Sequence, residues 1–63
     1  MKVDALAIRT EAYKKGVTQK AIAEACQLSR ATVNGIFNGR GCSEETATKI
    51  ATVLEVPVKR ITK

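Results

Sequence analysis

Residues 18–39, with the sequence TQKAIAEACQLSRATVNGIFNG, constrain the fold of this chain more than any other segment. Thr18 and Ser29 each mark a helix start, because a short hydroxyl side chain accepts a hydrogen bond from the free N–H groups of a first helical turn. Only Gln27 and Leu28 lie between the two expected helices, and the segment closes with an Asn-Gly pair, a typical helix end. The segment therefore predicts two short helices joined by a tight turn.

The rest of the chain also has a helical pattern. We expect further helices over about residues 4–15, from a Ser43 cap through residue 54, and from Pro57 to about residue 62. Apolar residues at helical spacing define the inner faces of the first four helices: Ala5, Ile8 and Ala12; Ile22, Ala23 and Cys26; Val33, Ile36 and Phe37; Ala47, Ile50, Ala51 and Leu54. No strand pattern is present, so the fold class is predicted to be all-α, a compact five-helix domain over residues 1–63.

The small size of the chain limits its core. With 63 residues and an apolar fraction of 44%, the sequence suits one small globular domain. Tyr13 and Phe37 are the only aromatic residues, so the core must be mainly aliphatic. Self-association would bury additional apolar surface. The expected dimer contact lies in the C-terminal part, over about residues 53–63, and consists of Val53, Val56, Val58 and Ile61.

Positive charge is concentrated beside the two-helix segment. The chain has a formal net charge of +5, and residues 14–40 carry five basic side chains against one acidic side chain. The other residues are nearly balanced, with six basic and five acidic groups. A solvated basic face and a phosphate-binding surface are both compatible with this excess. Its coincidence with the two short helices favours the second interpretation.

The chain lacks the residues that several classes of function require. The chain has no His, and Cys26 and Cys42 are sixteen residues apart, so neither a metal site nor a disulfide framework is expected. We expect both cysteines to be reduced, structural thiols. No nucleophile setting and no Gly-rich phosphate loop are present, so we predict no enzyme activity, no cofactor and no small-molecule ligand. No signal peptide or membrane span is visible, which predicts a cytoplasmic protein.

The exposed face of the second short helix carries the candidate base contacts. Residues 30, 31, 34 and 35 lie opposite the apolar residues 33, 36 and 37 at helical spacing. Arg30 can donate two hydrogen bonds to guanine, Ala31 can contact a thymine methyl group, and Asn34 has the donor and acceptor that adenine needs. Arg30 and Asn34 could also be passive surface residues. Gly35 could permit a close approach of the backbone to DNA. Alternatively, the helix could simply tolerate a glycine at this position.

Phosphate contacts are expected around these helices. Thr18 and Gln19 place polar groups at a helix N-terminus, where backbone N–H groups favour anions. Lys20 and Thr32 could contact phosphates or serve only their own helices. Lys14 and Lys15 are better explained as partners of the negative C-terminal end of the first helix.

The pattern Gln19-x3-Ala23-x4-Leu28-x4-Val33, followed by Ile36-Phe37-Asn38-Gly39, resembles the helix-turn-helix of the phage Cro and repressor family, also called the xenobiotic-response-element family. The resemblance extends over about residues 8–61 and implies a lambda-repressor-like domain whose third helix enters the major groove of DNA. It also implies that Gln19 binds a phosphate, that base contacts come from Arg30, Ala31, Asn34 and Gly35, and that Asn38 and Arg40 hold the DNA backbone.

The chain departs from this family at two places. Gln27 stands where the family commonly has glycine, so a positive φ there would cost about 1 kcal/mol. The family's arginine in the first helix and its acidic partner near the end of the third correspond to Ala12 and Phe37. We therefore expect an apolar contact in place of that ion pair.

These features together predict a sequence-specific transcriptional regulator that binds double-stranded DNA. The resemblance and the small size favour a repressor from a phage or mobile element, bound as a weak or DNA-dependent homodimer to an inverted-repeat operator. Two alternatives remain open. One is an antitoxin that represses its own operon, and the other is a protein-interaction module with the same fold that does not read bases.

Overall fold

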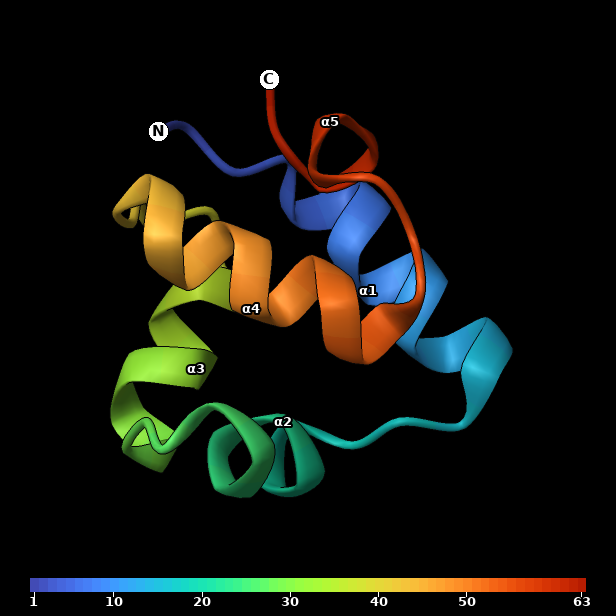
Figure 1. Ribbon diagram of the computed structural model, residues 1–63, viewed down its shortest axis with the longest axis vertical. Helices are drawn as coiled ribbons and strands as arrows, with labels where there is room; N and C mark the ends of the chain where they lie inside the picture. The colour runs from blue at the N-terminus through green and yellow to red at the C-terminus, as the bar shows by residue number, and fades with distance from the viewer.

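Five helices account for most of the chain in the computed structural model, which describes residues 1–63 (Figure 1). They are α1 (Ala5–Lys15), α2 (Gln19–Cys26), α3 (Arg30–Phe37), α4 (Glu44–Leu54) and α5 (Val58–Ile61). The all-α, five-helix prediction is confirmed. One detail at α5 was wrong, because Pro57 is the N-cap of that helix and not its first residue.

Local capping sets the first four helix starts. The side chains of four N-cap residues each accept a hydrogen bond from the backbone N–H three residues later, at 3.1 Å: Asp4, Thr18, Ser29 and Ser43. Each of these bonds satisfies one N–H group that the first helical turn leaves without a partner. Gly16 ends α1 in the left-handed conformation and donates to carbonyl groups of the last turn.

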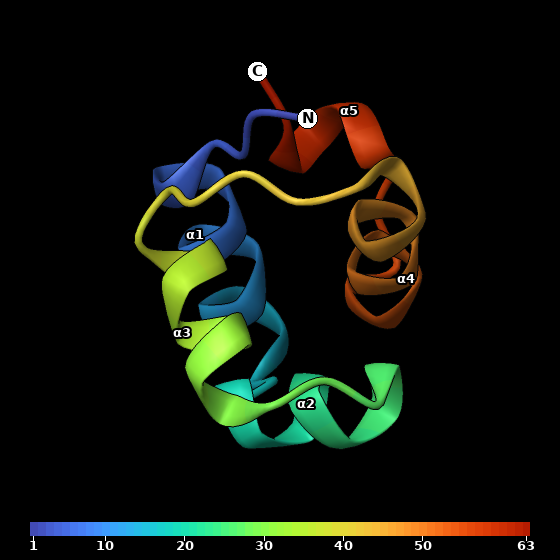
Figure 2. The same ribbon diagram turned by 90° about the vertical axis from the view of Figure 1, so that its left-hand side faces the viewer.

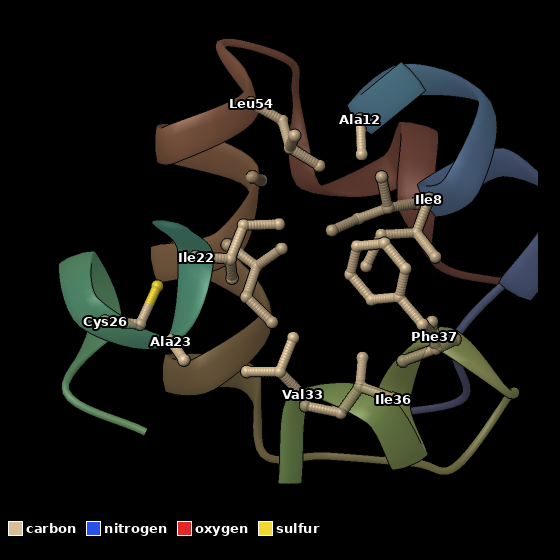
Figure 3. Close-up of a cluster of buried hydrophobic side chains, with 13 residues drawn as sticks. Ile8, Ala12, Ile22, Ala23, Cys26, Val33, Ile36, Phe37 and Leu54 are labelled. Carbon is tan, nitrogen blue, oxygen red and sulfur yellow. The ribbon is translucent and has the colours of Figure 1, made fainter. Parts of the chain in front are cut away.

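The helices enclose one hydrophobic cluster, most of which is drawn in Figure 3. Its members come from α1 to α5 and from the N-terminal segment: Val3, Ile8, Ala12, Ile22, Ala23, Cys26, Val33, Ile36, Phe37, Ile50, Ala51, Leu54 and Ile61. Phe37 is its only aromatic member, whereas Tyr13 is 89% exposed. The core is therefore mainly aliphatic, as the composition predicts.

Helices α2 and α3 are held at a steep crossing by small and branched side chains. Figure 2 shows α2 across the base of the molecule and α3 rising along one side. Ala23 and Val33, which are both buried, face this crossing, and Leu28 in the turn packs against the core. The short side chain of Ala23 lets the helices approach closely. The predicted burial of Ala23 and Val33 on the inner faces of their helices is confirmed.

The two ends of the chain lie close together (Figures 1 and 2). Val3 and Thr62 form an isolated antiparallel bridge, with the Asp4 N–H donating to the Ile61 carbonyl at 2.9 Å. The N–H of Cys42 donates to the Met1 carbonyl at 3.1 Å. The N-terminal segment thus joins the loop before α4 to the chain after α5, a closure that helical periodicity does not predict.

The C-terminal residues expected at a dimer contact differ in exposure. Val53, Val56 and Val58 are half-buried and pack against the core from outside. Ile61 is only 1% exposed and belongs to the core itself. Its assignment to a dimer contact is wrong, because its side chain has no surface left for a second chain. None of the five helices combines the length and the apolar character needed to cross a membrane.

Candidate nucleic-acid interface

The residues expected to contact bases share the outer face of α3. Arg30, Ala31 and Asn34 are exposed and Gly35 is half-buried, whereas the opposite face of α3 is buried in the core through Val33, Ile36 and Phe37. Arg30 is the first residue of the helix. The structure therefore brings these four residues together on one accessible surface, which we call the α3 outer face.

The N-terminus of α2 has groups that can donate to a phosphate. Thr18 uses its Oγ1 atom to accept from the Ala21 N–H, so its hydroxyl hydrogen stays available for donation. The backbone N–H groups of Gln19 and Lys20 have no hydrogen-bond partner within the chain. Lys20 is exposed and Gln19 is half-buried. This helix end has the polarity and the free donors that bind anions.

Thr32 has a structural role at the start of α3. Its Oγ1 atom accepts a hydrogen bond from the Ser29 hydroxyl at 2.8 Å, and its N–H donates to Ser29 Oγ at 3.1 Å. The Thr32 hydroxyl hydrogen can still be donated outward. The N-cap function of this pair is therefore compatible with a phosphate contact.

Arg9 connects α1 to the end of α3 and was missed by the sequence analysis. Its Nε–H donates to the Phe37 carbonyl at 2.8 Å, and its guanidinium also donates to Asn38 Oδ1. An arginine can only donate, so the oxygen of the Asn38 amide must face Arg9. The Asn38 NH2 group is then turned away from Arg9 and can donate to DNA. Ala12 and Phe37 both lie in the core as expected, but a polar connection accompanies their apolar packing.

Arg40 follows the reversal of the chain at Gly39, which has a φ of +96°. The Arg40 N–H donates to the Gly35 carbonyl at 2.9 Å, and the Arg40 side chain lies against Gly35. A glycine inside a helix costs about 0.5–1 kcal/mol relative to alanine. A Cβ atom at Gly35 would stand 3.2 Å from Arg40 Cδ, which is closer than an ordinary van der Waals contact, so the arginine side chain would have to shift by a few tenths of an ångström.

The basic side chains divide into paired and unpaired groups. Glu11 is 6% exposed and has three cationic partners, with nitrogen–oxygen distances of 3.6–3.8 Å: Lys14, Lys15 and Arg60. Lys15 also donates to the Leu54 carbonyl at 2.7 Å. By contrast, Lys20, Arg30 and Arg40 have no carboxylate within 4.0 Å, so their charges remain available to phosphates.

The turn between α2 and α3 contains a strained residue. Gln27 has a φ of +57°, in the left-handed region where side chains other than glycine are disfavoured. Its N–H donates to the Glu24 carbonyl and helps to end α2. Gln27 thus takes a positive φ at the position where the family commonly has glycine.

Both cysteines are free thiols. Cys26 is buried in the core and Cys42 is half-buried beside the N-terminus. Burial raises the pKa of Cys26, and the nearby charge of Lys49 partly offsets this effect. Burial likewise raises the pKa of Cys42, against the charge of the N-terminal ammonium. No group of three or more His, Cys, Asp or Glu side chains is placed to hold a metal ion.

Two helices joined by a tight turn, with a polar and basic outer face, define the class of helix-turn-helix DNA-binding proteins. The chain belongs to the Cro/C1-type helix-turn-helix family, because the helix-turn-helix family model matches residues 7–61. It therefore has the fold of DNA-binding transcription regulators. No curated protein sequence matches the chain.

Two solved structures of controller proteins are similar to the chain. The restriction-modification controller protein C.AhdI from Aeromonas hydrophila has a TM-score of 0.80 and 28% sequence identity, with 89% of this chain and 86% of that chain covered. The wild-type restriction-modification controller protein C.Esp1396I has a TM-score of 0.72 and 30% identity. The match with C.Esp1396I covers 84% of this chain and 70% of that chain.

Proposed function

We propose that this protein is a sequence-specific transcriptional repressor that occupies a promoter, with α3 in the major groove of double-stranded DNA. The α3 outer face carries this proposal, because it presents Arg30, Ala31 and Asn34 to solvent directly opposite the buried side of the same helix. The protein bound to its operator would exclude RNA polymerase from the promoter by steric overlap. The protein needs no cofactor for this action.

Base recognition in this proposal depends mainly on Arg30. Its guanidinium would donate to guanine O6 and N7, a contact that contributes about 1–3 kcal/mol of discrimination. Ala31 would contact a thymine methyl group and Asn34 would pair with adenine. Arg30 has no carboxylate partner in the free protein, so binding guanine would break no ion pair.

Phosphate contacts would position α3 in the groove. Donors are available at the N-terminus of α2 and around α3, and the hydrogen bonds that Thr18, Thr32 and Asn38 make within the protein leave a donor free on each side chain. The proposed phosphate contacts are Thr18, Gln19, Lys20, Thr32, Asn38 and Arg40. These contacts would supply affinity and salt dependence rather than sequence preference.

Two copies of the chain would bind an inverted repeat. One short reading helix covers few base pairs, and proteins of this fold commonly double their contact by dimerisation. Val53, Val56 and Val58 are half-buried apolar residues near the C-terminus and keep part of their surface exposed. We place the dimer contact on these three residues, which we call the C-terminal valine patch.

Control of a restriction-modification system is a second candidate function. The structural similarity to C.AhdI and C.Esp1396I, at 28% and 30% identity, supports it. The two functions are compatible, because the second specifies which genes are regulated. Restriction and methyltransferase genes beside the gene for this chain would support it, whereas a neighbouring toxin gene would favour the antitoxin alternative.

A matched pair of variants tests base reading. Arg30→Ala should relax the base preference at one position of each half-site and weaken specific binding by about 1–3 kcal/mol. Arg40→Ala should weaken binding to all sequences alike and reduce the slope of log affinity against log salt by about one. Lys63→Ala removes a remote positive charge and serves as the control.

The pattern of results separates the proposals. An unchanged base preference in Arg30→Ala would contradict α3 as the reading helix. Binding by the parent protein that depends on salt but on no sequence would instead support the protein-interaction module.

A further inference from the structure

The interior of α3 contains a glycine that the helix itself does not require. Gly35 lies in the middle of the outer face of α3, where alanine would be the more stable helical residue. The Arg40 side chain lies against the position that a Cβ atom on Gly35 would take. A Cβ atom on Gly35 would stand 3.2 Å from Arg40 Cδ, 3.6 Å from Nη1 and 3.7 Å from Cβ.

The path of the backbone brings Arg40 to this position. After α3 ends, Gly39 adopts a φ of +96° and turns the chain back towards the helix. The Arg40 N–H then donates to the Gly35 carbonyl at 2.9 Å. The Arg40 backbone is thus hydrogen-bonded to Gly35, and the Arg40 side chain lies against the same residue.

The position of Gly35 puts the Arg40 guanidinium on the face expected to meet DNA. Gly35 follows Asn34 and lies one helical turn after Ala31, and both of these residues are exposed. The charge of Arg40 is not neutralised by any carboxylate within 4.0 Å. The guanidinium of Arg40, a residue outside the helix, therefore already lies at the α3 outer face in the free protein.

We propose that Gly35 is a positioning residue for Arg40: the missing Cβ lets the arginine lie across α3, and the DNA affinity contributed by Arg40 depends on this placement. The proposal rests on the proposed DNA-binding function and assigns Gly35 a role other than direct base contact. Ordering a free arginine side chain on binding has a conformational cost. Packing against Gly35 reduces this cost before DNA arrives.

A double-mutant cycle tests the proposal. Gly35→Ala, Arg40→Ala and the double variant are compared with the parent protein for affinity to one duplex at fixed salt, with thermal unfolding measured for each. Gly35→Ala should keep or raise the unfolding temperature, because alanine favours the helix. It should nevertheless weaken binding about two- to tenfold, the equivalent of ordering one long side chain.

The double variant shows whether Gly35 affects DNA affinity through Arg40 or by its own contact with DNA. We expect Gly35→Ala to have no effect on affinity when Arg40 is already alanine. An equal loss of affinity in both backgrounds would overturn the proposal, because Gly35 would then approach DNA itself. An unchanged affinity in Gly35→Ala alone would overturn it as well.

A measurement on the free protein separates this proposal from the proposed function. The ¹⁵N relaxation of the Arg40 Nε–H group should show an ordered side chain in the parent protein and a more mobile one in Gly35→Ala. Equal mobility in both would overturn the positioning role even if the parent protein binds DNA specifically. If the parent protein has no preferred sequence, the proposed function fails, and the relaxation data and the affinity for a random duplex still decide the role of Gly35.

Discussion

At the scale of single residues, Gln27 shows how the turn is formed at a cost in backbone strain. Its φ of +57° is the conformation that glycine adopts freely at a helix end. Gln27→Gly should therefore stabilise the protein by about 0.5–1 kcal/mol in urea unfolding. Glu24→Gly, inside the right-handed α2, should destabilise it by about 1 kcal/mol. A loss of stability in both variants would contradict a strained turn.

Arg9 is the residue that holds the end of α3 from outside the helix. Its two hydrogen bonds, to the Phe37 carbonyl and to Asn38 Oδ1, need the fork of a guanidinium. Arg9→Lys should destabilise the protein by about 1 kcal/mol in urea unfolding, because one ammonium cannot replace both bonds. Arg30→Lys, at a position without an internal partner, should change stability by less than about 0.5 kcal/mol. Equal stabilities of the two variants would contradict this role of Arg9.

The residues that sequence reasoning placed correctly are those whose environment is local. Val33, Ile36 and Phe37 are buried at helical spacing, and Arg30, Ala31 and Asn34 are exposed opposite them. The bond from Arg9 to Phe37 joins residues 28 positions apart, so it depends on how α1 and α3 pack. For the same reason the sequence left the role of Gly35 open, because Arg40 reaches it only through the turn at Gly39.

At the scale of elements, Glu11 joins the C-terminal ends of α1 and α4 to α5. It is buried and faces Lys14, Lys15 and Arg60, and Lys15 in turn donates to the last carbonyl of α4. Glu11→Gln removes the shared negative charge and should destabilise the protein by about 1–2 kcal/mol. This value is lower than for a fully buried pair, because the three cations retain contact with water.

An exposed ion pair on α4 provides the control for Glu11. Glu45 is 81% exposed and lies 3.8 Å from Lys49. Glu45→Gln should change the free energy of unfolding by less than about 0.5 kcal/mol. If both glutamine variants have the stability of the parent protein in urea unfolding, Glu11 does not connect these helices as described.

Helix starts were more predictable than connections between helices. Thr18, Ser29 and Ser43 all cap the helices that they were expected to start, because each bond spans only three residues. The Glu11 cluster and the bridge between Val3 and Thr62 were not predicted, since they join segments far apart in the sequence. Ile61 was misplaced for a different reason, because a four-residue helix has too little periodicity to show which side faces the core.

At the scale of the whole molecule, the C-terminal valine patch should control assembly on DNA. Val53→Lys or Val58→Lys should weaken binding to a full inverted repeat at least about tenfold by adding charge to the dimer contact. Binding to a duplex with a single half-site should stay unchanged, which also shows that the variants fold. Titrations on the two duplexes check this, and parental affinity for the full repeat in both variants would contradict a dimer through this patch.

The most direct test of the whole account is selection of bound duplexes from a random pool at near-physiological salt, run with the parent protein and with Arg30→Ala. The parent protein should enrich an inverted repeat whose half-site centres lie about one helical turn apart. Arg30→Ala should lose the preference for one guanine in each half-site. Enrichment of no sequence by the parent protein, or of the same repeat by both proteins, would contradict base reading by α3.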